Sequence, residues 1–446
     1  MSPVWRVLRF SAPAGSSRTA YLDGLRGFAA LMVYWGHHQL WAHDGEGAQG
    51  IFENAYGYNG QYYFACLPGV RTLFSGGHFA VSVFFVLSGY VLSAKPLLLI
   101  QRGDLVALGD NLSSALFRRW LRLHLPVICT TFTYMTILHL FRIRAIPETK
   151  PTYLEEVRNW YIEFKNFSFI FRGGGDPWLT YNFHAWSIPV EFRGSIIVYT
   201  VLLAFSRCRP NARLCGHLLL IFYFLYIADG WFCALFVAGM LLCDLDLSAS
   251  RGETPTILTS LEPWKKPIFY ALFAVSMYLG GVPSENSDLQ LLRDSRGWHY
   301  LSFLKPQAVF DYKWFYLFWA ATLLVASVYR IAPLRAFFEL PFNQYLGYIS
   351  FAFYLVHGPV LWVLGDRLYA AVGWTRVSHP TTCPGWIDRF PIPRIGPLGM
   401  ELSFLFPHII LLPVTLWLAE VVTRVVDEPS VQFASWLYGK LLAVEF

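Results

Sequence analysis

The sequence has 446 residues, of which 55% are hydrophobic, 18% are aromatic and only 14% are charged. Charged residues make up about a quarter of an ordinary soluble protein, so this composition excludes a soluble globular chain. The formal net charge is +6, but no basic stretch with interleaved aromatic residues forms the kind of patch that binds nucleic acid. We therefore expect a protein embedded in a lipid bilayer, with no nucleic-acid partner.

Apolar stretches long enough to cross a bilayer, about 17 to 25 residues each, recur along the chain. The predicted fold class is all-α, a polytopic membrane protein with about ten transmembrane helices. The fifth and sixth of these are separated only by Asp229 and Gly230, a pair typical of a tight turn. The predicted spans are 25–41, 78–97, 125–141, 186–205, 214–229, 231–247, 267–282, 314–331, 345–364 and 402–426.

Lysine and arginine are enriched in short cytoplasmic connections of membrane proteins. If the N-terminus is cytosolic, the short connections 98–124 and 206–213 face the cytosol, and both are rich in arginine. The connection 42–77 then lies outside, and Arg71 is its one basic residue. We therefore expect a cytosolic segment 1–20, a membrane domain 21–430 and a cytosolic tail 431–446. The expected location is the endoplasmic reticulum or another endomembrane.

The first predicted span, in LRGFAALMVYWGHHQL, contains Arg26 and His37. Eleven residues are three helical turns plus about 20°, so the two side chains share one face and lie about 16 Å apart. Ionisable groups inside a membrane are costly and are usually functional. Imidazole is well suited to accept a hydroxyl proton near neutral pH, although a histidine can also simply bond to a neighbouring helix.

The second span contains FFVLSGYVLS, with Ser88 and Gly89 near its middle. Small residues allow helices to pack closely, and close packing explains Ser88 and Gly89 at least as well as a role in lining a channel. No G-x-S-x-G motif surrounds Ser88. A nucleophilic serine is therefore not supported.

Arginines precede the third span in FRRWLRLHLP. Arg119 and Arg122 are three residues apart and share a helix face, where two guanidinium groups could hold phosphate. Taken alone, they are equally typical of the positive flank of a membrane helix. Because Arg26 is predicted on the same side of the membrane, an anion site becomes more plausible.

The fourth span begins in NFHAWSIPVEFRGS, which contains Glu191. A glutamate near the start of a helix can simply favour the helix dipole. However, Glu191, His37 and His357 of the ninth span are all predicted toward the outer half of the membrane, so they could form one polar cluster. The seven cysteines include no C-x-x-C pair, so no zinc site or disulfide framework is indicated, and we expect no metal and no tightly bound cofactor.

These motifs together resemble the integral-membrane acyltransferase 3 family. The resemblance rests on YLDGLRGFAALMVYWGHH, FFVLSGYVLS, RRWLR, WSIPVEF and YLGYISFAFYLVHGPV, which occur in the order typical of the family and span nearly the whole chain. Members of this family transfer acyl groups from acyl-CoA to hydroxyl groups. Pro189 departs from the usual form of the acidic motif. This proline, the EFRGS continuation and the long aromatic first outer loop are together most similar to fungal members.

The resemblance implies a role for each matching residue. His37 would be the catalytic base with Arg26 as its partner, and Glu191 would be the family's acidic residue. Arg119 and Arg122 match the arginine pair linked to binding of the donor. The implied reaction is acyl transfer, with acetyl as the expected group, from acyl-CoA as co-substrate to the hydroxyl of a small-molecule acceptor such as a secondary metabolite.

Two alternatives remain open from the sequence. A polytopic transporter of an organic anion would also bury histidine, arginine and glutamate, although no repeat symmetry typical of transporters is present. A membrane-bound O-acyltransferase of a different fold would use a histidine in a hydrophobic segment, and His357 is the best candidate for that role.

Overall fold

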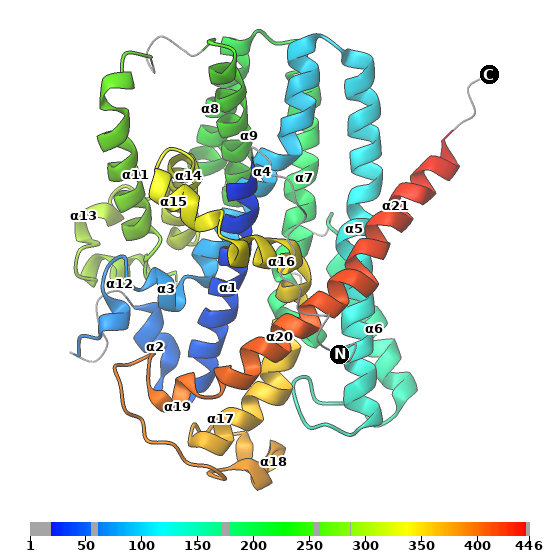
Figure 1. The fold of residues 1–446 in the computed structure, drawn as a ribbon, viewed down its shortest axis with the longest axis vertical. Coiled ribbons are helices and arrows are strands. Elements are labelled where there is room, and N and C mark those ends of the chain that lie inside the picture. Colours follow the sequence, from blue (N-terminus) through cyan, green and yellow to red (C-terminus); the bar gives the residue numbers. More distant parts are fainter. Residues whose placement is uncertain (1–18, 55–60, 172–177, 254–258, 286, 443–446) are drawn as a thin grey trace.

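The computed structural model describes residues 19–54, 61–171, 178–253, 259–285 and 287–442, and within them the chain is helical, without a β-strand (Figure 1). The predicted fold class, an all-α polytopic membrane protein, is confirmed. The longer helices are α1 (Ala20–Ala42), α4 (Gly77–Arg102), α5 (Leu105–Leu140), α6 (Tyr153–Ser168), α7 (Ser187–Ala204), α8 (Pro210–Phe222), α9 (Trp231–Ser250), α11 (Lys265–Leu279), α14 (Tyr312–Val328), α16 (Pro341–Val360), α20 (His408–Val422) and α21 (Glu428–Leu441).

Shorter helices lie in the connections, and four irregular helical turns adjoin the longer helices. The short helices are α2 (Ala48–Glu53), α3 (Thr72–Ser75), α12 (Leu289–Asp294), α13 (His299–Ser302), α15 (Ala332–Phe338), α17 (Asp366–Val372), α18 (His379–Thr382) and α19 (Leu402–Leu405). The irregular turns are the 3₁₀ segment η4 (Thr180–Trp186) and the π-helical turns η5 (Tyr223–Ile227), η7 (Leu361–Gly365) and η9 (Thr423–Asp427).

Each of the ten predicted spans falls on a helix, but not every helix is long and apolar enough to cross a membrane by itself. Seven helices in the described part of the chain meet that standard, and an eighth does if α14 and α15, bent by 95°, form one broken span. The exceptions are α1, which carries two charged residues and two adjacent histidines, and α11, which has only 15 residues.

Helix α1 lies at the centre of the bundle and packs mainly against α16 and α4. Arg26 bonds to the carbonyl of Gly347, and His37 bonds to His357, so α1 and α16 run in the same direction. The two backbones touch, because a Cβ added to Gly27 would lie 2.3 Å from the backbone nitrogen of Gly347. This close approach holds the polar groups of the two helices at matching levels.

In the predicted orientation, the C-terminal end of α1 faces outward. It is covered by residues 373–401, which follow α17 and are called the outer segment here. The Gln39 amide donates to the carbonyl of Gly399 at 2.7 Å, and His43 lies 3.2 Å from a carboxylate oxygen of Glu401. Gln39 and His43 have no exposed surface. In Figure 1 this segment forms the lower end of the molecule, while the connection between α4 and α5 forms the upper end.

The C-terminal helices α20 and α21 form one long slanted rod that crosses the bundle (Figure 1). Most of the segment 431–446, predicted as a tail, is therefore helical, up to Leu441. Helix α21 packs against α5, and the guanidinium of Arg118 donates to Ser435. The predicted N-terminal segment 1–20 lies almost wholly outside the described residues.

Candidate active site

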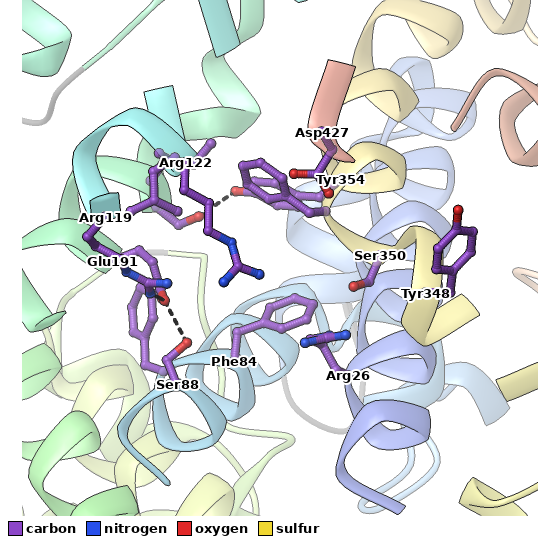
Figure 2. A pocket seen from close by; sticks show the side chains of 15 residues that line it. Arg26, Phe84, Ser88, Arg119, Arg122, Glu191, Tyr348, Ser350, Tyr354 and Asp427 are labelled. Carbon is purple, nitrogen blue, oxygen red and sulfur yellow. Dashed lines mark hydrogen bonds and ion pairs between the residues drawn. The ribbon is translucent and has the colours of Figure 1, made fainter. Parts of the chain in front are cut away.

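A cavity of about 220 Å³ lies where α1, α4, α5, α7, α16 and the π-helical turn η9 meet (Figure 2). It contains the three arginines and the glutamate singled out from the sequence, together with one aspartate. The residues lining it are Arg26, Phe84, Phe85, Ser88, Arg119, Arg122, Leu123, Ser187, Ile188, Glu191, Tyr348, Ser350, Phe351, Tyr354 and Asp427. Three guanidinium groups and two carboxylates leave an excess of one positive charge, which suits an anionic ligand.

On one wall of the cavity, Glu191 is held by an ion pair with Arg119. Arg119 also donates through Nε to the hydroxyl of Ser195, one turn later in α7, at 2.8 Å. The Ser88 hydroxyl donates to the same carboxylate oxygen of Glu191 at 2.6 Å. Arg119 is largely buried, so its charge is committed to Glu191, and Ser88 is a hydrogen-bond donor to the carboxylate.

Arg122 differs from Arg119 although the two are one turn apart on α5. Its side chain keeps exposed surface, points into the cavity (Figure 2), and makes no hydrogen bond or ion pair with another described residue. Asp427 attracts both Arg122 and Arg26 electrostatically. Arg26 itself is paired with Asp23 at 3.1 Å and bonded to Gly347. Arg122 is therefore the guanidinium best placed to take up an added anion.

His37 lies deeper along α1 and is hydrogen-bonded to His357, with 2.9 Å between Nδ1 of His37 and Nε2 of His357. A third imidazole, that of His184 in η4, stacks on His37 with ring centroids 3.8 Å apart. The expected polar cluster therefore contains His37 and His357, but His184 takes the place of Glu191. Glu191 lies seven residues beyond His184, about 10 Å along a helix, and meets Arg119 instead.

The three histidines offer nitrogen atoms within 4.8 Å of one another, as a metal site would. However, their rings are parallel to within 12°, with His184 stacked over the other two. A metal ion bound to an imidazole lies close to the ring plane, and stacked parallel planes do not share a common point. The arrangement therefore suits hydrogen bonding and proton transfer better than metal ligation.

A second group of potential metal ligands consists of Asp366, the first residue of α17, and of His379 and Cys383 in the segment that follows α17. The Nδ1 atom of His379 accepts a bond from the backbone N–H of Arg376, so its Nε2 carries the proton and donates to Asp366 at 3.0 Å. The indole of Trp41 donates to the same carboxylate oxygen. A metal would have to displace these bonds, so this group is a structural hydrogen-bond network.

Tyr354 separates the cavity from the histidines. Its ring lines the cavity, its hydroxyl lies 2.8 Å from that of Ser187, and it donates to the backbone carbonyl of His184. The ring centroid of Tyr354 is 5.8 Å from that of His357. Cavity and histidine cluster are therefore adjacent parts of one polar region, with Tyr354 between them.

The sequence interpretation missed three residues of this region. His184 stands in the quoted NFHAWSIPVEF motif. It precedes Glu191 by seven residues, about two helical turns, so the sequence could have placed both side chains on one helix face. Tyr354 precedes His357 by three residues and so shares its helix face. Asp427 gave no signal, because it ends the π-helical turn η9, which changes the face that a helix presents.

Comparison with known proteins assigns the chain to a family. Residues 19–418 match the acyltransferase domain family, Acyl_transf_3, and the chain belongs to this family. The O-acetyltransferase PaAT-1 of Phomopsis amygdali is 29% identical over 469 positions, covering 96% of this chain and 86% of that protein. Acyltransferase clz18 of Cochliobolus lunatus is 22% identical over 438 positions, covering 82% and 87% of the two chains. No solved structure matches the chain.

The protein is thus a multi-pass membrane acyltransferase, as the resemblance of its motifs indicated. The matched family is neither the transporter nor the second O-acyltransferase fold that were kept as alternatives.

Proposed function

We propose that the protein transfers an acetyl group from acetyl-CoA to a hydroxyl group of a small molecule, with His37 as the general base. The observation that supports this best is the adjacency of a positively charged cavity and an imidazole cluster inside the membrane bundle. A fungal relative named as an O-acetyltransferase supports acetyl as the group and oxygen as the acceptor atom. We further propose a secondary metabolite as acceptor and an endomembrane as the location.

On the donor side, Arg122 and Arg26 would bind the phosphates of CoA. Guanidinium groups bind phosphate with paired, charge-assisted hydrogen bonds, and Arg122 has these donors available. From Arg26 to His37 the rise along α1 is about 16 Å, a length that an extended pantetheine arm can cover. The thioester would then reach His37 after passing Tyr354, whose hydrogen bond to Ser187 has to open or shift.

On the acceptor side, His37 would take the hydroxyl proton as the oxygen attacks the thioester carbonyl. A base positioned in this way contributes typically 10² to 10⁴ in rate. Glu191 would orient a substrate polar group at the cavity wall, because its carboxylate has one oxygen fixed by Arg119 and Ser88. It would not act as the base, since it is already paired with an arginine.

The test uses membranes that contain the full-length protein, acetyl-CoA labelled in the acetyl group, and an organic extract of metabolites from the host. We expect thiol release that depends on the extract, together with a labelled product heavier by one acetyl group. Membranes with His37→Ala protein at the same level are the control. Labelled acetate or uptake of label into vesicles, with no acetylated product, would contradict an acetyltransferase and favour hydrolysis or transport.

A further inference from the structure

His357 is hydrogen-bonded to His37 across the contact between α16 and α1. Its Nε2 atom lies 2.9 Å from Nδ1 of His37. A neutral imidazole has one N–H donor and one acceptor nitrogen, so one of these two atoms carries a proton and donates it to the other. Because Nδ1 of His37 is occupied by this bond, Nε2 is the ring nitrogen of His37 that is left for a substrate.

The proposed role of His37 as the base decides which of the two rings donates. A base needs a free lone pair toward the substrate, so Nε2 of His37 has to be unprotonated. A neutral His37 then carries its proton on Nδ1 and donates it to Nε2 of His357, which accepts and carries its own proton on Nδ1. The Nε2 atom of His37 makes no hydrogen bond with any residue in the described part of the chain.

The surroundings favour His37, and not its neighbours, as the ring with an accessible nitrogen. His37 retains exposed surface, whereas His184 and His357 are buried. Nδ1 of His184 has no hydrogen-bond partner, so His184 holds the ring of His37 by stacking only. No described carboxylate bonds to His37, because Glu191 is engaged with Arg119. The lone pair of His357 is therefore the acceptor that supports a proton on His37.

We propose that His357 is a positioning residue that fixes His37 in the tautomer whose free Nε2 acts as the base. The proposal rests on the function proposed above. In the transfer step the acceptor O–H bond breaks and its proton moves to Nε2 of His37, while the oxygen bonds to the thioester carbon. The C–S bond breaks, and the leaving thiolate takes that proton. His37 returns to the neutral form, and its Nδ1 proton stays on the bond to His357 throughout.

Two amide substitutions separate this role from packing. The side-chain oxygen of His357→Gln can occupy the place of Nε2 and accept from His37, whereas the shorter amide of His357→Asn ends near the place of Nδ1. We expect His357→Gln to keep kcat within about tenfold of wild type. His357→Asn should lower kcat by about 10² to 10⁴, because loss of the correct histidine tautomer costs up to about 10⁴. KM for acetyl-CoA should change little in both.

The matched control is His217→Asn, which replaces another buried histidine, located in α8. It should lower thermal stability without lowering kcat. In a His37→Ala background, His357→Asn should have no further effect on the residual rate, because it acts through His37. Rates are expressed per amount of folded protein, so that a lower folded fraction is not read as a lower kcat.

Equal kcat for His357→Gln and His357→Asn in folded protein would overturn the positioning role, and so would additive losses with His37→Ala. Either result would leave the proposed function intact, provided that wild-type protein still acetylates an acceptor. Absence of acetyl transfer by wild-type protein would instead contradict the proposed function itself.

Discussion

Arg119 and Glu191, from α5 and α7, form an ion pair across the cavity wall that leaves Arg122 as the arginine without a described partner. The two arginines of the RRWLR motif therefore make different contacts, although their spacing suggested a single phosphate fork. Arg119 fixes a carboxylate, and Arg122 presents its donors to the cavity.

Arg122→Lys and Arg119→Lys are accordingly expected to differ. A lysine keeps the positive charge but cannot form the paired bonds of a guanidinium. Since a charge-assisted hydrogen bond contributes roughly 1.5 to 3 kcal/mol, Arg122→Lys should raise the KM for acyl-CoA about tenfold or more. Arg119→Lys should mainly lower thermal stability. Donor kinetics unchanged in Arg122→Lys, with orientation in the membrane preserved, would remove Arg122 from the donor site.

His37→Ala and His38→Ala provide a second contrast, because the adjacent side chains point about 100° apart. His37→Ala should reduce acyl transfer by about 10² to 10⁴ with little change in thermal stability. His38→Ala should lower thermal stability and largely keep acyl transfer, since His38 is buried and bonded to the hydroxyl of Tyr369 at 2.7 Å. Rates and melting temperatures measured in detergent distinguish them, and equal, substantial activity in both variants would refute His37 as the base.

Gly358→Ala tests whether the placement of His184 matters. A Cβ at Gly358 would lie 2.6 Å from Nδ1 of His184 and 3.2 Å from Trp362, so the His184 ring has to move and its stacking on His37 weakens. We expect kcat to fall at least severalfold while KM for the donor stays constant. Gly439→Ala in α21, where a Cβ would meet nothing within 4 Å, is the control. Normal kcat in Gly358→Ala would make the stacking irrelevant to the reaction.

Glu401 predicts a pH dependence of stability. Burial of this carboxyl favours its neutral form, but hydrogen bonds from His43 and the backbone N–H of Gly399 outweigh burial, and the pKa of Glu401 is lowered from the ordinary 4.5. A lowered pKa in the folded state stabilises the protein above pH 4.5, and this contribution is lost as the pH falls through the lowered value.

The variant Glu401→Gln should therefore melt at a lower temperature than wild type at pH 7, and the difference should shrink as the pH falls below 4.5. The measurement is thermal unfolding of both proteins in detergent over this pH range. A difference that is independent of pH would show that the ionised carboxylate is not what holds the outer segment onto α1.

The sequence predicted which segments are helices and which charged residues matter, because long apolar runs and polar residues within them are local signals. It could not predict partners. Arg119 and Arg122 look alike in sequence, and only Glu191, 72 residues later, distinguishes them. Similarly, Glu191 and His184 lie on one segment, but which of the two meets His37 depends on the position of that segment along its own axis. Asp427 reaches the cavity through a π-helical turn that hydropathy does not reveal.

The contact between Gly27 and Gly347 has a consequence for which changes in length the protein can tolerate. Eleven residues separate Arg26 from His37 in α1, and ten separate Gly347 from His357 in the parallel helix α16. One residue inserted within either interval would rotate everything beyond it by 100° and displace it by 1.5 Å. The bond at one end could then be kept only by losing the bond at the other. Insertions and deletions compatible with the fold are therefore confined to the connections outside these two intervals, where the length of the chain does not set the distance from the cavity to His37.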